Sequence, residues 1–264
     1  MTTAINTLSS PLPKTSVNFK TALASEWTKF VSVRSTWWST LSAFALMAGG
    51  SLILAMDFVG DLSEPQSVQD DPRTQIAVGE IAGDSTQLVQ FATVALAMMV
   101  VTSEYSTGAI RNTLQADPNR TRLLIAKTAI IGAVTFISGI LLGLIGILAA
   151  QAGLDGHGIW NTTDVTQAVF AIATYLSLVS MMTVGIAMAL RSAVATLSTT
   201  LMLLLGMMML LNGEIVHYTP GMAGSNFIRD NTTYYSRPAG IVIVAVWTLV
   251  TLGAGYVVLK KRDA

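Results

Sequence analysis

The chain has 264 residues, of which 52% are hydrophobic and only 11% are charged. About a quarter of the residues of a soluble globular protein are charged, so this composition excludes a soluble domain and indicates a membrane protein. The formal net charge is zero, and the chain has no cysteine, which excludes a disulfide framework and a thiolate metal site.

The segment before the first apolar span divides into two parts. Residues 1–16 are polar and unlike a secretory signal, so we expect a disordered tail. Residues 17–34 are amphipathic, and the apolar stripe at helical spacing consists of Phe19, Leu23, Trp27, Phe30 and Val31. Tryptophan and basic residues beside a span predict a helix lying in the membrane interface. The alternative is a cytosolic helix packed on a partner.

Six segments are long and apolar enough to cross a membrane, which takes a helix of about 17–25 residues. Windows free of charged residues predict spans at about residues 35–57, 85–103, 128–152, 165–190, 192–212 and 238–259. Because these windows are continuous apolar runs without alternation, they exclude a β-barrel. The sequence therefore predicts an all-α membrane protein in which residues 1–264 form a single transmembrane domain.

The basic residues predict how the spans are oriented. With the N-terminus inside, 12 of the 15 lysines and arginines lie on the inner side, and only Arg73, Arg229 and Arg237 lie outside. This asymmetry follows the positive-inside bias. We therefore expect a multi-pass protein of the cell inner (plasma) membrane with both termini in the cytoplasm.

Glycines predict two further features of the spans and their connections. The segment Asn212–Arg237 is more apolar than a plain outer loop, and glycines and Pro220 break it into short pieces. This pattern predicts two short re-entrant helices that dip into the outer leaflet; a surface loop is the alternative. In the third span, Gly139 and Gly143 predict close helix packing within the chain.

Several kinds of chemistry are missing from the sequence. None of the six charge-free windows, the first of which ends at Met56, contains the Asp, Glu, Lys, Arg or His that ion-coupled carriers place at mid-membrane. No Gly-Lys pair exists, so the chain lacks a phosphate-binding loop for ATP. We therefore expect no enzymatic activity, no metal and no cofactor in this chain.

One inner loop, Ser103–Lys127, is long enough for another protein to bind. Ser106 or Thr107 would cap a short helix, which Asp117-Pro118 would end. The alternative is a plain connecting loop. Glu104 lies where the second span leaves the membrane, and a carboxylate is costly to leave unpaired there. We expect it to contact a lysine or arginine of this chain, or backbone donors; the alternative is a solvated side chain.

The same loop resembles the signature of type-2 ABC transporter permeases. The matching residues are Glu104-Tyr105-Ser106-Thr107-Gly108, then Ile110-Arg111-x-Thr113-Leu114, then Arg120 and Ala126-Lys127. Three further segments resemble actinobacterial members of that family: Ser25-Glu26-Trp27-Thr28-Lys29, Val33-Arg34-Ser35-Thr36-Trp37-Trp38 and Lys261-Arg262-Asp263-Ala264.

The resemblance implies a permease subunit of an ATP-driven exporter that works by alternating access. Its partners would be two copies of an ABC ATPase subunit, which hold ATP and Mg, a second permease subunit (an identical copy or a paralogue) and membrane lipid, with no nucleic acid. Residues 17–34 would be the connecting helix, and the inner loop would hold the coupling helix. The implied ATPase-coupling residues are Glu104, Tyr105, Ser106, Thr107, Gly108, Ile110, Arg111, Leu114 and Arg120.

The resemblance also implies that spans two and five face a central substrate cavity. Its lining would include Met98, Met99, Met202, Met207 and Met208, although methionine also fills gaps in packed cores. Spans without charge favour an apolar or amphipathic substrate, namely a drug, a peptide or a lipid, as in multidrug or antimicrobial peptide resistance. The alternative function is an immunity or sensing module of an ABC-type complex that binds an antimicrobial ligand without net transport.

Overall fold

The computed structural model describes residues 18–62 and 74–261, and the predicted tail, residues 1–16, lies outside them. Six helical segments of this part are long and apolar enough to cross a membrane, as the sequence predicts. They are α2 (Arg34–Asp61), α4 (Val78–Ser106), α6 (Arg120–Gly153), α7 (Thr162–Leu190), the segment Ala193–Leu210 and α11 (Arg237–Lys261). The chain is therefore an all-α, multi-pass membrane protein.

The third span begins earlier than its charge-free window. The α6 helix starts at Arg120, because Asn119 caps it by accepting a hydrogen bond from the Arg122 N–H group. Arg120 donates hydrogen bonds to the carbonyls of Leu259 (2.6 Å) and Lys260 (3.3 Å). A guanidinium at the last carbonyls of a helix satisfies its unpaired acceptors, so Arg120 joins the start of α6 to the end of α11.

The fifth span is not a regular α-helix. It consists of α8 (Ala193–Leu201), the π-helical turn η1 (Met202–Gly206) and α9 (Met207–Leu210). At the end of η1 the Met207 N–H donates to the Met202 carbonyl, five residues back. The spacing of apolar residues in the sequence does not predict such a wide turn, which is rare.

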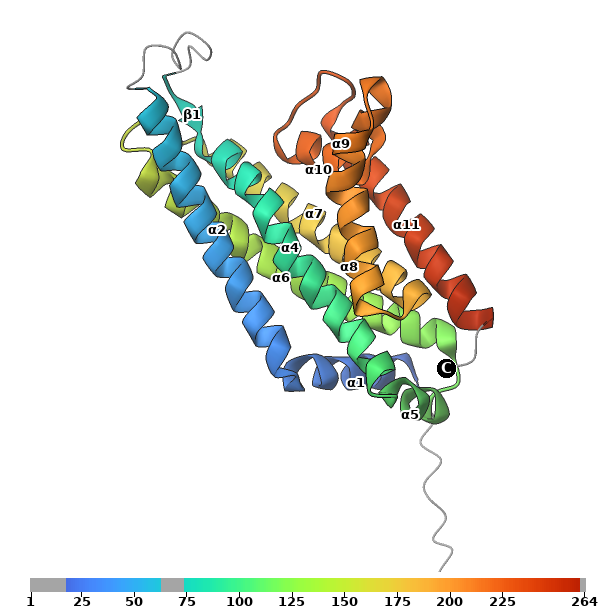
Figure 1. Cartoon of the computed structure of the whole chain (residues 1–264). Helices are drawn as coiled ribbons and strands as arrows, with labels where there is room; N and C mark the ends of the chain where they lie inside the picture. Colours follow the sequence, from blue (N-terminus) through green and yellow to red (C-terminus); the bar gives the residue numbers. More distant parts are fainter. Residues whose placement is uncertain (1–17, 63–73, 262–264) are drawn as a thin grey trace, which may run out of the picture.

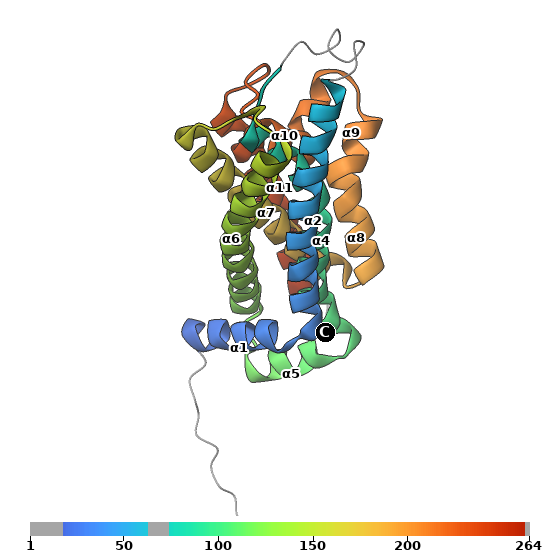
Figure 2. The ribbon, with the colours of Figure 1, turned by 90° about the vertical axis from the view of Figure 1, so that its left-hand side faces the viewer.

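The spans form an inclined bundle in which α7 is the most buried (Figure 1). The α7 helix packs against α4, α6 and α11 and supplies much of the apolar core. Figure 2 shows α2 on the near side of the bundle, with α6 to its left and α8 to its right. The segment Ala193–Leu210 and α11 are the least buried of the spans. Two residues each of β1 (Ile76–Ala77) and β2 (Gly158–Ile159) pair in parallel and join two connections at one end.

Two glycines let α6 and α7 approach closely. A Cβ atom on Gly139 would lie 2.6 Å from the Cα of Ala173, and one on Gly143 would lie 3.1 Å from the Cα of Val169. Both neighbours are backbone atoms of α7, so the predicted close packing within the chain is confirmed.

This contact predicts a large effect for Gly139→Val, because the backbone of α7 must move to admit the new side chain. Overpacking of this kind costs about 1–3 kcal/mol or more. Gly253→Val in α11 is the matched control, since nothing lies within 4 Å of a Cβ there. Thermal unfolding of both variants in detergent is the measurement, and equal midpoints would contradict the packing.

A short helix lies across one end of the bundle. The α1 helix (Phe19–Ser32) begins with a capping box between Asn18 and Thr21 and ends at the extended residue Val33, so the helix predicted at 17–34 is confirmed. Its face toward the spans carries Ala22, Glu26 and Phe30. Most of the predicted apolar stripe, including Trp27 and Val31, is exposed. That stripe is therefore available to the surroundings of the bundle.

The opposite end carries the two short helices predicted after the fifth span. These are the 3-10 helix η2 (Gly213–Tyr218) and α10 (Pro220–Ile228). Glycines bring α10 close to the bundle: a Cβ on Gly221 would meet the Leu204 carbonyl of η1, and one on Gly224 would meet the Tyr175 ring of α7. Because α10 is largely buried, it is not a surface loop.

Candidate functional site

Four charged side chains meet at the end of the bundle where α1 lies. Lys127 of α6 contacts Glu26 of α1 (Nζ to Oε2, 2.5 Å) and Glu104 of α4 (Nζ to Oε1, 3.0 Å). Lys29 of α1 contacts the same two carboxylates, at 2.7 Å from Glu26 Oε1 and 2.9 Å from Glu104 Oε1. We call these four residues the charge cluster.

The charge cluster is largely removed from solvent. The side chains of Lys127, Glu26 and Glu104 are 1%, 3% and 10% exposed, and that of Lys29 is 35% exposed. Two positive and two negative charges balance each other, which is what a buried group of charges requires. The prediction that Glu104 meets a basic residue of this chain is confirmed, and the partners are Lys127 and Lys29.

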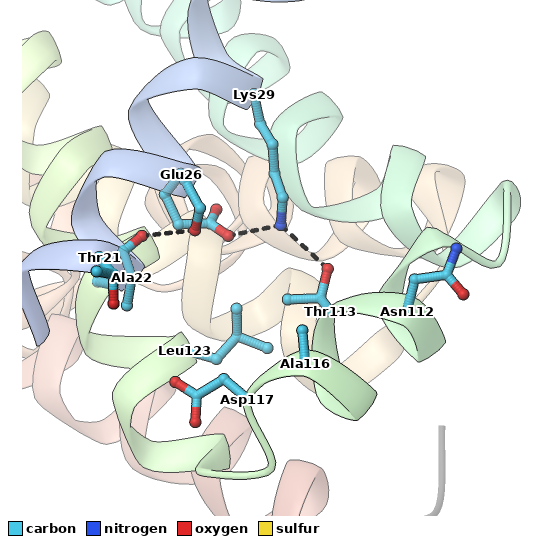
Figure 3. Close-up of a pocket in the computed structure, with 11 residues that line it drawn as sticks. Thr21, Ala22, Glu26, Lys29, Asn112, Thr113, Ala116, Asp117 and Leu123 are labelled. Atoms are coloured by element: carbon cyan, nitrogen blue, oxygen red, sulfur yellow. Dashed lines mark hydrogen bonds and ion pairs between the residues drawn. The ribbon is translucent and has the colours of Figure 1, made fainter. Parts of the chain in front are cut away.

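A hydrogen bond connects the charge cluster to a helix outside the spans. The short helix α5 (Ala109–Ala116) follows α4, and the Lys29 ammonium donates to the Thr113 hydroxyl of α5 at 3.1 Å (Figure 3). A cavity of about 420 Å³ separates the rest of α5 from α1. It is lined by Thr21, Ala22, Ser25, Glu26, Lys29, Asn112, Thr113, Ala116, Asp117, Leu123 and Ala126. The charge cluster thus joins α1, α4, α5 and α6.

The start of α5 corrects the predicted cap. The N-cap is Gly108, in the left-handed conformation (φ 73°), and no side chain caps the helix. The hydroxyls of Ser106 and Thr107, predicted to cap α5, donate instead to the Ser103 carbonyl of α4. Serine and threonine in the last turn of a helix readily bond back to a carbonyl three or four residues earlier, which removes them as caps for the next helix. The predicted end at Asp117-Pro118 is confirmed.

The other predicted coupling residues divide into two groups. Ile110 is buried, and Tyr105 lies under the Arg191 guanidinium, 5.2 Å from ring centroid to Cζ, with its hydroxyl 3.5 Å from the Met188 sulfur. These residues, like Arg120, hold the loop against the spans. Arg111 is exposed and Leu114 is half-buried. The outer face of α5 is therefore formed around Arg111 and Asn112.

The methionines predicted to line a substrate cavity have different surroundings. Met98 is buried, Met99, Met207 and Met208 are half-buried, and Met202 is exposed. The sulfur of Met208 lies 2.9 Å from the position of a Cβ on Gly221, so Met208 fills the space beside α10. Methionine adapts to irregular gaps, and at this position it packs one chain segment on another.

Sequence reasoning missed Glu26 as a partner of Lys127, although a signal was present. Glu26 lies four residues from both Ala22 and Phe30, so all three share one helical face. An acidic residue between small and apolar residues on one face indicates a buried charge that needs a basic partner. Which basic residue lies opposite depends on how α1 crosses α6, which the sequence does not specify.

Opposing effects act on the pKa values of the α1 residues. Burial raises the pKa of Glu26, but the charges and hydrogen bonds of Lys127 and Lys29 outweigh it and hold this pKa below its ordinary value of 4.5. Burial lowers the pKa of Lys29, but the hydrogen bonds and charges of Glu26 and Glu104 outweigh it and hold this pKa above its ordinary value of 10.5. Both residues are therefore charged at neutral pH.

The sign of these shifts predicts a pH dependence. Stabilisation by Glu26 is complete above pH 4.5 and is lost as the pH falls through the lowered pKa, because the unfolded chain takes up the proton first. Stabilisation by Lys29 is complete below pH 10.5 and is lost as the pH rises through its raised pKa. We expect the difference in unfolding midpoint between wild type and Glu26→Gln to be constant near neutral pH and to shrink below pH 4.5. A difference that stays constant in acid would contradict the pairing.

No group of three or more His, Cys, Asp or Glu side chains within residues 18–62 and 74–261 is arranged to hold a metal ion. Comparison with known proteins gives no match to a family model and no match to a curated protein. The site is therefore described by its own geometry: a short helix outside the spans, bonded to three other helices through a balanced group of buried charges.

Proposed function

We propose that this chain is the membrane-spanning permease subunit of an ATP-driven ABC exporter. It moves an apolar or amphipathic compound by alternating access, and a separate ATPase subunit supplies the energy. The observation that carries the proposal is the position of α5, which has one side bonded into the spans and the other side exposed at Arg111 and Asn112. The resemblance of residues 104–127 to the permease signature supports it.

In this mechanism α5 receives the motion of the ATPase. Displacement of α5 pulls on Lys29 through Thr113, and Lys29 is bonded to both carboxylates of the charge cluster. Buried ion pairs resist separation, because each charge would be left without a partner in a medium of low dielectric. The motion therefore reaches α1, α4 and α6 together, and these helices move as a unit between the inward-open and outward-open states.

The assembly we propose contains two permease subunits and two ATPase subunits. The 12-to-3 division of basic residues supports placing α1, α5 and the charge cluster on the cytoplasmic side, where ATP and Mg are bound by the partner. The exposed apolar stripe of α1, with Trp27, suits a helix in the membrane interface. The weakly buried segment Ala193–Leu210 has apolar surface to offer a second permease subunit or lipid.

The absence of cysteine from the chain makes a direct test simple. A single cysteine at Asn112 of α5, carrying a photoactivated cross-linker, is expected to capture an ABC ATPase in membranes of the native cells. The matched control is a cysteine at Ile215 of η2, which is also exposed but lies at the other end of the bundle, and it is expected to capture none. Capture from both positions, or from neither, would contradict the proposal.

A further inference from the structure

A chain of hydrogen bonds runs from α7 to α4 and ends on a half-buried amide. Tyr175 of α7 is fully buried, and its hydroxyl donates to Gln90 Oε1 of α4 at 2.8 Å. The Gln90 amide nitrogen donates in turn to Gln87 Oε1 (2.8 Å) and to the Gln87 backbone carbonyl (3.1 Å). Both amide protons of Gln90 and its side-chain oxygen are thereby engaged, so any unused hydrogen-bonding capacity lies on Gln87.

The direction of these bonds leaves the Gln87 nitrogen without an acceptor. A backbone carbonyl can only accept, so the end of the Gln90 side chain that faces the Gln87 carbonyl is its NH2 group. The same NH2 group faces the Gln87 side chain, which therefore presents its oxygen. The two N–H groups of Gln87 Nε2 are left over, and they have no acceptor in residues 18–62 and 74–261. Gln87 Oε1 also keeps a second lone pair.

This amide belongs to the apolar part of the second span. Gln87 lies inside the charge-free window 85–103, and its neighbours Leu88 and Phe91 are exposed. Gln90 lies about one helical turn further into the span, so its bond to Gln87 keeps the amide from turning toward the outer headgroups. Hydrocarbon tails offer no acceptor, and an unpaired amide is costly among them. An acceptor from outside the chain would remove this cost.

The surface around Gln87 is open between two weakly buried segments. Figures 1 and 2 both show α4 running between α2 and α8, and α4 packs on both. The part of α4 that stays open carries Gln87, Leu88 and Phe91, and we call it the α4 face. Because α2 and the segment Ala193–Leu210 bury little of their own surface, apolar surface continues on both sides. The α4 face is thus an apolar surface that carries one amide.

An amide of this kind can pair with a copy of itself. Two identical chains related by a two-fold axis meet through the same surface, so a residue close to the axis contacts its own counterpart. We propose that a second, identical copy of this chain covers the α4 face, and that the Gln87 amide of each copy donates to the Gln87 amide oxygen of the other. Such bonds between helices stabilise association in a bilayer. The inference rests on the proposed pairing of two permease subunits and names the second as an identical copy.

Cross-linking tests the location of this interface, because the chain has no cysteine of its own. The full chain with Phe91→Cys, expressed alone in a heterologous host, is expected to give covalent dimers with a short bifunctional maleimide in membrane vesicles. Leu141→Cys is the control: Leu141 is exposed on α6 and lies 14 residues from Lys127. Phe91 lies 13 residues from Glu104, so the two cysteines are at a similar depth. Dimers from both positions, or from neither, would overturn the proposal.

A second measurement tests the amide itself. Gln87→Met keeps the length of the side chain but has neither an N–H nor a carbonyl, and we expect it to weaken self-association of the full chain in lipid vesicles about tenfold. Leu88→Met changes the adjacent exposed side chain and is expected to stay within about twofold of wild type. Single-molecule subunit counting at increasing lipid dilution measures both, and unchanged association of Gln87→Met would refute the pairing. A chain that stays monomeric while α5 captures an ATPase would overturn this inference and leave the transport function standing.

Discussion

Lys127→Met is expected to destabilise the folded chain by about 3–5 kcal/mol, the cost of removing one partner from a buried group of charges. The Lys127 side chain is 1% exposed and lies between Glu26 and Glu104. Without its ammonium, two carboxylates face each other with only the half-exposed Lys29 to balance them. Methionine keeps the length of the side chain, so the effect reports the charge and not a cavity.

Lys20→Met is the matched control, because Lys20 is exposed on α1 and the same substitution there removes only a solvated charge. We expect it to change the free energy of unfolding by less than about 0.5 kcal/mol. Adding Glu104→Gln to Lys127→Met is expected to recover part of the loss, since it removes one of the unpaired charges. Thermal and denaturant unfolding in detergent measure all three. Equal destabilisation by Lys127→Met and Lys20→Met would show that the charge cluster contributes nothing.

Gly108→Pro is expected to displace α5 and to abolish capture of the ATPase by the cross-linker at Asn112. Gly108 has φ 73°, and its N–H donates to the Tyr105 carbonyl at 3.3 Å. Proline fixes φ near −65° and has no N–H, so the turn between α4 and α5 cannot form. The hydrogen bond from Lys29 to Thr113 is then lost, and amide exchange in α5 accelerates while α4 and α6 stay protected.

Two controls separate this effect from general damage. Gly108→Asn is expected to keep most of the capture, because asparagine adopts the left-handed conformation at lower cost than other side chains. Gly156→Pro makes the same backbone change at another left-handed glycine (φ 89°), at the opposite end of the bundle. We expect it to leave α5 exchange unchanged. A Gly108→Pro chain that still captures its ATPase would remove α5 from the proposed mechanism.

The parts of the fold that the sequence predicts are those decided by local pattern. Absence of charge over about 20 residues is sufficient to locate a span, since the hydrocarbon sets both the length and the composition. Gly139 and Gly143 predict close packing because a residue without a side chain allows any helix that lies opposite it to approach closely. The start of α5 could not be predicted in this way. The local sequence favours Ser106 or Thr107 as its cap, but their hydroxyls donate to the Ser103 carbonyl of α4, and the left-handed Gly108 is the N-cap.

The candidate site was harder to predict because its parts come together from distant segments. Lys127 contacts Glu26, which is 101 residues away in the sequence. Glu104 and Lys127 lie at the two ends of one loop in the sequence. The pairing of Glu104 with a basic residue is therefore predictable. The place of Glu26 depends on which face α1 turns toward the spans. The apolar stripe with Trp27 marks the face that a helix in the membrane interface exposes, and it does not show that Glu26 faces the spans.

The π-helical turn η1 has a consequence for the angular phase of the fifth span. In an α-helix each step of four residues advances about 40° around the axis, so positions spaced by four drift away from any one neighbour. The span buries Thr196, Thr200 and Leu204 at this spacing. The wider turn at Met202–Gly206 rotates each residue by a smaller angle and so reduces this drift. As a result Leu204 and Met208 both contact Gly221 of α10. One side of the span thus contacts the bundle through α8 and the α10 helix through α9. In an unbroken α-helix of the same sequence, these two contact regions would face in different directions.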